Sequence, residues 1–371
     1  MEKVKLGDFV SIKTGKLDAN ASNTNGRYPF FTCANEPLKI DNYSYDCECV
    51  LVAGNGDLNV KYYNGKFDAY QRTYIIESKD TKNLLNKYLY YLINSKIVKL
   101  REDSIGGVIK YIKLSNLTEI KFEPIKAQEQ KKLVENLDKV QAIIDIREKQ
   151  IEQLDELIRS QFVEIFGDPF ENKNNYKFIT FDNFMERCVD IGSNGANKTV
   201  VEHLDMKDTE DYALLVRTLN FTSNDFKNNV KYISKDAYEF FSKSKVFGGE
   251  IIFNKIGSAG INFLMPDLQR PVSLGLNQIM VTPKKINTRY LYDFLNTEYG
   301  KHQINSRVNG AVTKSIQKTE LKKIPIMYPP MELQKQYSDF AEQIDKQKFE
   351  IQKSLEQMEK LQESLMNKYF S

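Results

Sequence analysis

The chain has 371 residues, of which 41% are hydrophobic and 28% charged, a composition that supplies core material for two globular units and excludes wholesale disorder. The formal net charge is only +3, so charge by itself identifies no class of partner. The sequence has no run of about eighteen apolar residues and no apolar N-terminal stretch, which argues against a membrane-spanning helix and a signal peptide. We therefore expect a cytoplasmic protein.

The cysteines and histidines do not predict a metal site. Cys33, Cys47, Cys49 and Cys188 lack zinc-ribbon or zinc-finger spacing, and the chain has only two histidines. Free cysteine is among the most frequently buried residue types, so we expect four reduced, buried thiols.

The first segment, up to about residue 123, alternates short strand-like runs with turns and predicts an α+β or mostly-β domain. Residues 50–53 form an apolar run that ends in a Gly-Asn-Gly-Asp turn, and residues 61–67 predict a hairpin around Asn64 and Gly65. Residues 88–100 have the pattern of an amphipathic helix, which Gly106 and Gly107 end. A last strand over residues 120–123 leads to Pro124.

Residues 127–166 predict one long helix, because forty residues contain no proline or glycine and their apolar residues recur in steps of three and four. At about 1.5 Å per residue the helix is roughly 60 Å long. Its apolar stripe is narrow, as in a coiled coil, and is interrupted by Arg147 and Gln161. Such a helix needs a partner. The stripe consists of Leu133, Leu137, Val140, Ile144, Ile151, Leu154, Ile158 and Ile165.

The pattern then starts again, which indicates a tandem duplication. Residues 87–90 resemble residues 289–292, and from Gly106 onward the offset is 204. The matched pairs include Gly106 with Gly310, Val108 with Val312, Lys110 with Lys314, Gln130 with Gln334, and Phe166 with Phe370.

A second long helix is predicted over residues 331–370, with interruptions at Lys348 and Gln362. Its stripe consists of Tyr337, Ala341, Ile344, Ile351, Leu355, Met358, Leu365 and Tyr369. We expect the two helices to form an antiparallel intramolecular coiled coil with one globular domain at each end, a pseudo-two-fold repeat of class α+β. The expected parts are domain 1 (1–126), helix 1 (127–167), domain 2 (168–329) and helix 2 (330–371).

The two globular segments differ in length at their front. Phe9 matches Phe184 at an offset of 175 and Gly56 matches Gly257 at 201, so the second segment is longer by 201 minus 175, or 26 residues. Equal scaffolds with unequal fronts suggest two different ligand half-sites.

No catalytic motif is convincing. The Gly54 to Gly56 turn lacks the third glycine of a dinucleotide fingerprint, and Pro329-Pro330 is better explained as a helix start. Polar, amide and aromatic side chains near the turns are instead candidates for pairing with base edges and phosphates, although each one alone could be ordinary surface. They are Lys16, Asn55, Lys61, Tyr63, Tyr70, Gln71, Arg72 and Lys110, then Lys198, Arg217, Asn220, Lys255, Ser258, Arg270, Asn277, Gln278 and Lys314.

The whole chain resembles the specificity (S) subunits of Type I restriction-modification systems. The resemblance rests on residues 4–9 and 53–76, the helix entries IKFEPIKAQEQKKLVE and IPIMYPPMELQKQ, and the helix ends LDELIRSQFVEIFGD and MEKLQESLMNKYF. It implies a non-catalytic subunit whose two target-recognition domains read a bipartite site in double-stranded DNA.

The same resemblance implies the partners. Two modification (M) subunits would bind the helices, hold S-adenosylmethionine and methylate adenine, and restriction (R) subunits, if present, would use ATP and Mg. It implies no cofactor, metal or membrane for this chain itself. Two other functions stay open: a coiled-coil scaffold or adaptor whose heads bind proteins, and a self-sufficient DNA enzyme.

Overall fold

A computed structural model describes residues 3–370. Residues 3–150 with 351–370 form one compact unit, and residues 151–350 form the other. We call the globular part of each unit, without the two long helices, the first head and the second head. Within the described part of the chain, no helix has the length and apolarity needed to cross a membrane.

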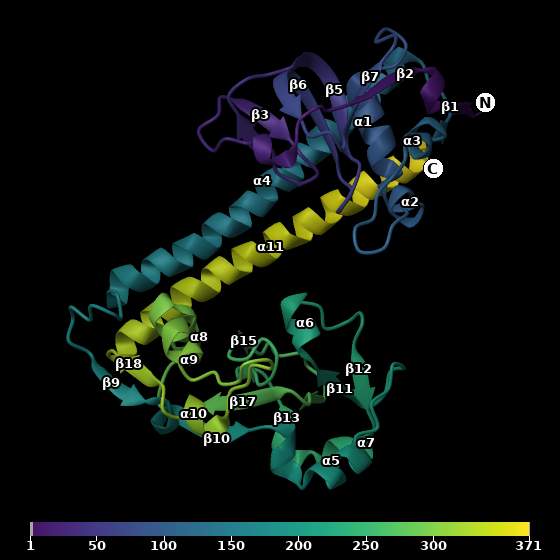
Figure 1. Cartoon of the computed structure of the whole chain (residues 1–371). Coiled ribbons are helices and arrows are strands. Elements are labelled where there is room, and N and C mark those ends of the chain that lie inside the picture. The colour runs from purple at the N-terminus through teal and green to yellow at the C-terminus, as the bar shows by residue number, and fades with distance from the viewer. Residues whose placement is uncertain (1–2, 371) are drawn as a thin grey trace. The chain divides into compact units, whose positions relative to one another are not determined.

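Two forty-residue helices, α4 (Ala127–Phe166) and α11 (Met331–Phe370), have the bounds that the sequence predicted. They pack antiparallel (Figure 1). Gln362 donates to Gln141, and Lys348 pairs with Asp155, so 14 residues forward on α4 (141 to 155) match 14 residues backward on α11 (362 to 348). The two polar interruptions of the α11 stripe, Lys348 and Gln362, are therefore paired with polar residues of α4.

The first head contains a six-stranded sheet in the order β2-β7-β5-β6-β3-β4 and a two-stranded sheet of β1 and β8. β5 is buried on both faces, because Val50 and Val52 pack toward the helices while Cys49 and Leu51 pack on the opposite side, which explains its continuous apolar run. The strands are β1 (Val4–Lys5), β2 (Val10–Thr14), β3 (Tyr28–Phe31), β4 (Leu38–Ile40), β5 (Tyr45–Ala53), β6 (Val60–Ala69), β7 (Thr73–Ser78) and β8 (Lys121–Phe122). The helices are α1 (Asn86–Ser95), α2 (Ile97–Glu102) and α3 (Leu114–Thr118).

Two local predictions for this head are wrong. Asn64 and Gly65 form no turn but lie inside β6, paired with Glu48 and Cys47 of β5, because the long ladder between these strands overrides the local turn preference. The predicted helix over residues 88–100 is two helices, α1 and α2, which meet at Lys96.

The second head contains two four-stranded sheets, β10-β17-β14-β15 and β12-β11-β16-β13, and a two-stranded sheet of β9 and β18. Its strands are β9 (Lys177–Thr180), β10 (Met185–Val189), β11 (Ala213–Val216), β12 (Lys231–Ile233), β13 (Lys245–Val246), β14 (Ile251–Asn254), β15 (Asn262–Leu264), β16 (Val272–Leu274), β17 (Gln278–Pro283) and β18 (Pro325–Tyr328). Its helices are α5 (Asn197–His203), α6 (Thr218–Thr222), α7 (Lys235–Phe240), α8 (Thr288–Asn296), α9 (Glu298–Asn305) and α10 (Lys318–Leu321).

The predicted internal repeat is present in the structure. The strand order β2-β7-β5-β6 of the first head recurs as β10-β17-β14-β15, and each head continues with two helices, a short helix, a strand and a long helix. Between β10 and β14 the second head has strands β11, β12 and β13 and helices α5, α6 and α7, where the first head has strands β3 and β4 between β2 and β5.

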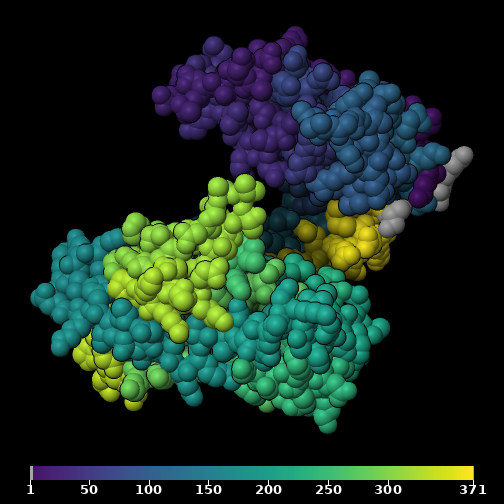
Figure 2. Space-filling view, turned by 60° about the horizontal axis from the view of Figure 1, so that its bottom comes forward, coloured from purple at the N-terminus to yellow at the C-terminus, as the bar shows by residue number. Residues whose placement is uncertain are grey.

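The ends of the long helices pack against the heads and complete the cores of the two compact units. Leu133 and Leu137 of α4 pack with Phe370 of α11 in the first head, whereas Phe162 and Phe166 of α4 pack in the second. Figure 2 shows the yellow end of α11 against blue atoms of the first head. The stripe predicted from the sequence omitted Phe162 and ended at Tyr369, which is exposed, while its neighbour Phe370 is buried against Tyr88.

All four cysteines are free, but only Cys49 is buried and the other three are half-buried. The expectation of four buried thiols is therefore wrong for Cys33, Cys47 and Cys188, which lie beside surface loops or on partly exposed strand faces.

Candidate nucleic-acid interface

Three backbone segments meet at one edge of the sheet in the first head. The turn after β5 is bonded to the loop before β7, because the Gly54 N–H donates to the Arg72 carbonyl oxygen at 2.8 Å. It is also bonded to the loop before α3, since the Gly56 N–H donates to the Lys110 carbonyl at 2.9 Å and the Ile112 N–H to the Gly54 carbonyl at 2.9 Å. We call this meeting of residues 54–57, 70–72 and 104–112 the first loop junction.

The second head repeats this arrangement bond for bond. The Lys255 N–H donates to the Asn277 carbonyl at 2.7 Å, the Gly257 N–H to Lys314 at 3.0 Å, and the Ile316 N–H to Lys255 at 3.0 Å. We call residues 255–258, 275–277 and 308–316 the second loop junction. Lys255 and Asn277 thus occupy the backbone positions of Gly54 and Arg72.

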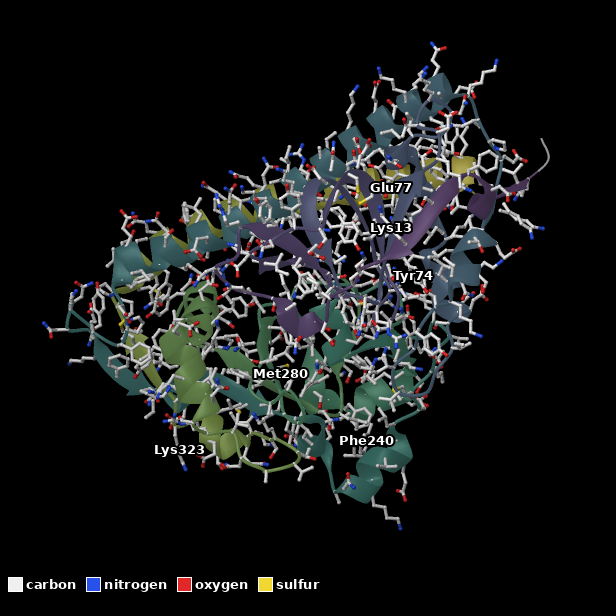
Figure 3. All side chains as sticks on the ribbon, turned by 45° about the horizontal axis from the view of Figure 1, so that its top comes forward. Lys13, Tyr74, Glu77, Phe240, Met280 and Lys323 are labelled. Carbon is white, nitrogen blue, oxygen red and sulfur yellow. The ribbon has the colours of Figure 1, made fainter. Side chains whose placement is uncertain are left out.

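The first junction presents Gln71 and Arg72, both exposed, at a hollow of about 310 Å³. Thr14, Tyr74 and Ile112 line the same hollow. The Tyr74 hydroxyl donates to the Ile112 carbonyl at 3.1 Å and so fixes the loop before α3 to β7. Figure 3 labels Tyr74 in the first head. An amide and a guanidinium beside a rigid hollow are the groups that pair with adenine and guanine edges.

The second junction has a charged network at its edge. Asp190, at the end of β10, is buried and lies 2.7 Å from the Lys255 ammonium and 2.8 Å from that of Lys318. Burial alone raises the pKa of Asp190, but hydrogen bonds from Lys255, Lys318 and Ser193 outweigh it and lower the pKa to about 2. Lys255, a candidate from the sequence, is therefore held as an ion-pair partner.

The other candidates of the first head divide into two groups. Asn55 and Lys110 lie in the junction and Lys16 is exposed after β2. Lys61 is half-buried against the side chain of Asn59, and burial lowers the pKa of its ammonium. Two tyrosines serve the fold: Tyr63 packs on Phe31 with ring centroids 5.0 Å apart, and Tyr70 bridges to Leu17.

In the second head, Asn220 and Gln278 are each 1% exposed. The Asn220 side-chain oxygen accepts from the Arg217 N–H at 3.0 Å, and that of Gln278 accepts from the Gly275 N–H at 3.1 Å. Both amides hold backbone turns, so we leave them out of the proposed interface.

Four more candidates are accessible or partly so. Arg217 donates to the Asn229 carbonyl, and Arg270 lies 3.4 Å from Glu210 and over the ring of Tyr232. Lys198 is exposed on α5, and Ser258 accepts from Asn254 at 2.9 Å. Of the candidates in this head, the junction brings together Lys255, Ser258, Asn277 and Lys314.

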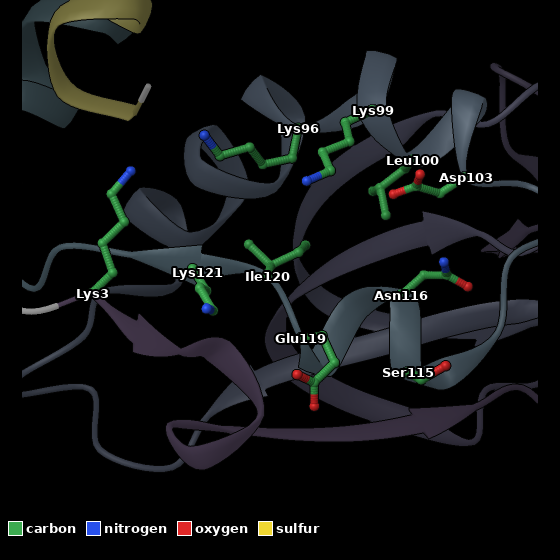
Figure 4. Close-up of a pocket in the computed structure, with 10 residues that line it drawn as sticks. All are labelled: Lys3, Lys96, Lys99, Leu100, Asp103, Ser115, Asn116, Glu119, Ile120 and Lys121. Atoms are coloured by element: carbon green, nitrogen blue, oxygen red, sulfur yellow. The ribbon is translucent and has the colours of Figure 1, made fainter.

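Sequence reasoning missed a basic hollow of about 610 Å³ in the first head. Four lysines line it, Lys3, Lys96, Lys99 and Lys121, together with Asp103 and Glu119 (Figure 4). Burial and the neighbouring charges of Lys3 and Lys99 lower the pKa of Lys96. The lysines come from three separated segments, so no local sequence signal could have assembled them.

Residues 3–370 contain no cluster of three or more potential metal ligands. The two junctions instead combine backbone turns with amide, guanidinium and ammonium groups, which are suited to base edges and phosphates.

The family model for the Type I restriction modification DNA specificity domain matches residues 1–156 and again residues 166–360. The chain is 27% identical to the specificity subunit of the Type I restriction enzyme EcoDI of Escherichia coli, over 99% of this chain and 87% of that protein. It is 23% identical to the MjaVIII specificity subunit of Methanocaldococcus jannaschii, over 99% and 91%.

Solved structures show the same fold. The S subunit of a Type I restriction-modification system from M. genitalium superposes with a TM-score of 0.66 at 16% identity, covering 100% of this chain and 96% of that one. A chain from a study of complex assembly and conformational transition in the type I R-M system gives 0.50 at 12% identity, covering 100% and 97%.

Proposed function

The chain belongs to the Type I restriction-modification DNA specificity family, and we propose that its two heads read the two halves of a bipartite, asymmetric DNA site. In this family the specificity subunit is the non-catalytic, DNA-recognising component of the restriction-modification complex. The observation that supports two different half-sites is the pair of loop junctions, which share their backbone hydrogen bonds but carry different side chains. A common scaffold with exchanged side chains is what two readers of different sequences require.

The side chains suggest how each junction contributes. Arg72 has the planar fork that pairs with guanine O6 and N7, and Gln71 can pair with adenine. In the second head, Asn277 has the amide that pairs with adenine, and Leu276, 45% exposed, suits the methyl group of thymine. Lys110, Lys314 and the exposed Lys198 are suited to phosphates.

We further propose that two modification subunits bind α4 and α11, hold S-adenosylmethionine and methylate adenine at each half-site. Apolar side chains on the outer faces of these helices support a protein partner: Ile146 is 56% exposed, Val163 50% and Phe349 59%. The length of the helices would then set the spacing between the half-sites. Restriction subunits using ATP and Mg could join the same complex.

Sequencing of modified bases in a host that carries this chain with its modification subunits tests the proposal. We expect methylated adenine in one motif made of two specific parts separated by a fixed, unspecified gap. Substituting residues of one head should change only one part. A single continuous motif would contradict the two-reader model, and a complex without any sequence-selective DNA binding would favour the adaptor function.

A further inference from the structure

Both junctions carry an exposed apolar residue that recognition of two different DNA sequences does not explain. The loops before α3 and α10 each carry a completely exposed valine at the tip, Val108 at 104% and Val312 at 98% relative exposure. We call residues 105–111 and 309–315 the tip loops. The two valines are 204 residues apart, the offset of the internal repeat, and the next charged residue, Lys110 or Lys314, is also shared.

The tip loops are built to be rigid. Ile105 and Tyr111 exchange two backbone hydrogen bonds of 3.0 and 2.8 Å, and Asn309 and Ser315 exchange the same two at 2.9 and 2.8 Å. Gly106, at φ +119°, permits the bend, since a Cβ there would lie 2.5 Å from the Ile109 carbonyl oxygen. Both loops therefore hold their valine outward on closed, anchored backbone.

Gly310 repeats this requirement in the second head, at φ +108° with a Cβ position 2.2 Å from the Thr313 oxygen. A fully exposed apolar side chain on a loop that is braced in this way, twice in one chain, indicates a contact surface and not a flexible connection.

The charge around the tips is one-sided. Each tip loop contains one lysine, Lys110 or Lys314, and no acidic residue. Among residues 3–370, no carboxylate lies within ion-pair distance of Lys110 or Lys314. The chain as a whole is nearly balanced, with 53 basic and 50 acidic residues. The tips are thus locally complementary to a polyanion.

We propose that the two tip loops are sequence-independent DNA contacts, in which Lys110 and Lys314 bind phosphates and Val108 and Val312 pack against deoxyribose or a base-pair edge. This inference rests on the proposed function. The side chains at Gln71 and Arg72 differ from those at Leu276 and Asn277, so they suit what differs between the half-sites. The shared tips suit what both half-sites have in common, which is the sugar-phosphate backbone.

The hydrogen bonds of the junctions favour DNA over a protein partner. Lys110 is bonded through its carbonyl to Gly56, and Gly54 of the same turn is bonded to Arg72, so the tip loop and the base reader form one connected unit. Any duplex that touches Arg72 lies beside the tip. Many DNA-binding proteins also combine basic side chains that bind in a groove with apolar side chains that insert between base pairs.

The lysines are tested in the purified complex of the full chain with its modification subunits. We expect Lys110→Gln and Lys314→Gln each to weaken binding about five- to tenfold at 0.1 M salt, equally for a duplex with the methylated motif and for a scrambled duplex. Each should lower the slope of log affinity against log salt by about 0.9. Lys82→Gln and Lys284→Gln are matched controls. Both lysines are exposed, and they follow the C-terminal ends of β7 and β17, whereas the loop junctions lie at the N-terminal ends of these strands.

The valines give a second, independent measurement. Val108→Ser and Val312→Ser should weaken both duplexes about threefold without changing the salt slope or the methylated motif. Val98→Ser and Val201→Ser, at exposed positions on α2 and α5, should have no effect.

Unchanged DNA affinity in all four loop variants would overturn the inference. Loss of modification subunits from the complex, with DNA binding by the remaining intact complexes unchanged, would overturn it in favour of a protein contact. Failure of the proposed function itself is distinguishable, because the unsubstituted complex would then bind the motif and scrambled duplexes equally.

Discussion

The two heads carry the same loop junction but stabilise it with different chemistry. In the described part of the first head this edge has no buried ion pair: Thr14 lines the hollow, and Gly54 fits because a Cβ there would lie 2.4 Å from the Arg72 carbonyl oxygen. In the second head the corresponding edge has the buried Asp190 with two lysines.

This difference shows which features the duplication kept. The backbone bonds, the glycines of the tip loops and the glutamines at the starts of α4 and α11 are shared, whereas the side chains before β7 and β17, at Gln71 and Arg72 and at Leu276 and Asn277, are not. The shared features hold the scaffold, and the exchanged ones are free to set the ligand. Three predictions test this division, in order of decreasing effect.

Gln130 and Gln334 should be equally important to their heads. Gln130 accepts from the Leu85 N–H at 3.0 Å and donates to two carbonyls, and Gln334 accepts from the Asn287 N–H at 2.9 Å. Both are almost fully buried, so alanine leaves unpaired polar groups and should cost about 2 to 3 kcal/mol in each head. Hydrogen exchange measured by mass spectrometry reports the loss of protection for each head separately.

Gln128→Ala and Gln336→Ala are the controls, because both side chains are exposed in the same helical turns. A loss confined to one head would show that the scaffolds are not equivalent.

Arg72→Ala and Asn277→Ala should affect different half-sites. These residues occupy equivalent backbone positions in the two junctions. Loss of a bidentate contact to a base should weaken binding by about 2 kcal/mol for arginine and by about 1 kcal/mol for asparagine, in each case at one base pair. Methylation rates on duplexes with single substitutions in either half measure this. Arg159→Ala, exposed on α4, is the control, and relaxation of both halves by one variant would contradict separate readers.

Asp190→Asn should change the acid stability of the second head by about 1 kcal/mol. The pKa of Asp190 is about 2 in the folded chain, below the value near 3.9 of an unfolded aspartate, so its stabilisation is complete above about pH 4 and is lost as the pH falls toward 2. The melting temperature of the full chain, measured by circular dichroism, should therefore fall less steeply between about pH 4 and pH 2 in the variant than in the unsubstituted chain. Thr14→Ala in the first head should leave the pH dependence unaltered.

The scaffold could be predicted from sequence because its signals are repeated and periodic. The bounds of α4 and α11, the antiparallel pairing and the internal repeat all follow from apolar spacing and the offset of 204. The stripe omitted Phe162, which contacts Tyr337 of α11 and Tyr290 of α8, because a helical period alone does not show where a stripe widens.

The candidate contact residues stay predictions, and the structure brings only some of them together at the junctions. Gln71, Arg72 and Asn277 lie in turns, and turn chemistry is visible in sequence. The burial of Asn220 and Gln278, and the pairing of Lys255 with Asp190 across 65 residues, depend on tertiary contacts that local patterns do not record.

The packing of Phe370 bears on how the chain folds during its synthesis. The Phe370 ring lies 5.3 Å from that of Tyr88, and Leu365 and Met366 pack on the same core. A ribosome adding about 5 to 20 residues per second makes Phe370 roughly 15 to 60 s after Tyr88. The second head has its whole core within residues 151–350. The head that is translated first is therefore completed last, and it spends that interval with an open apolar surface that a chaperone would recognise.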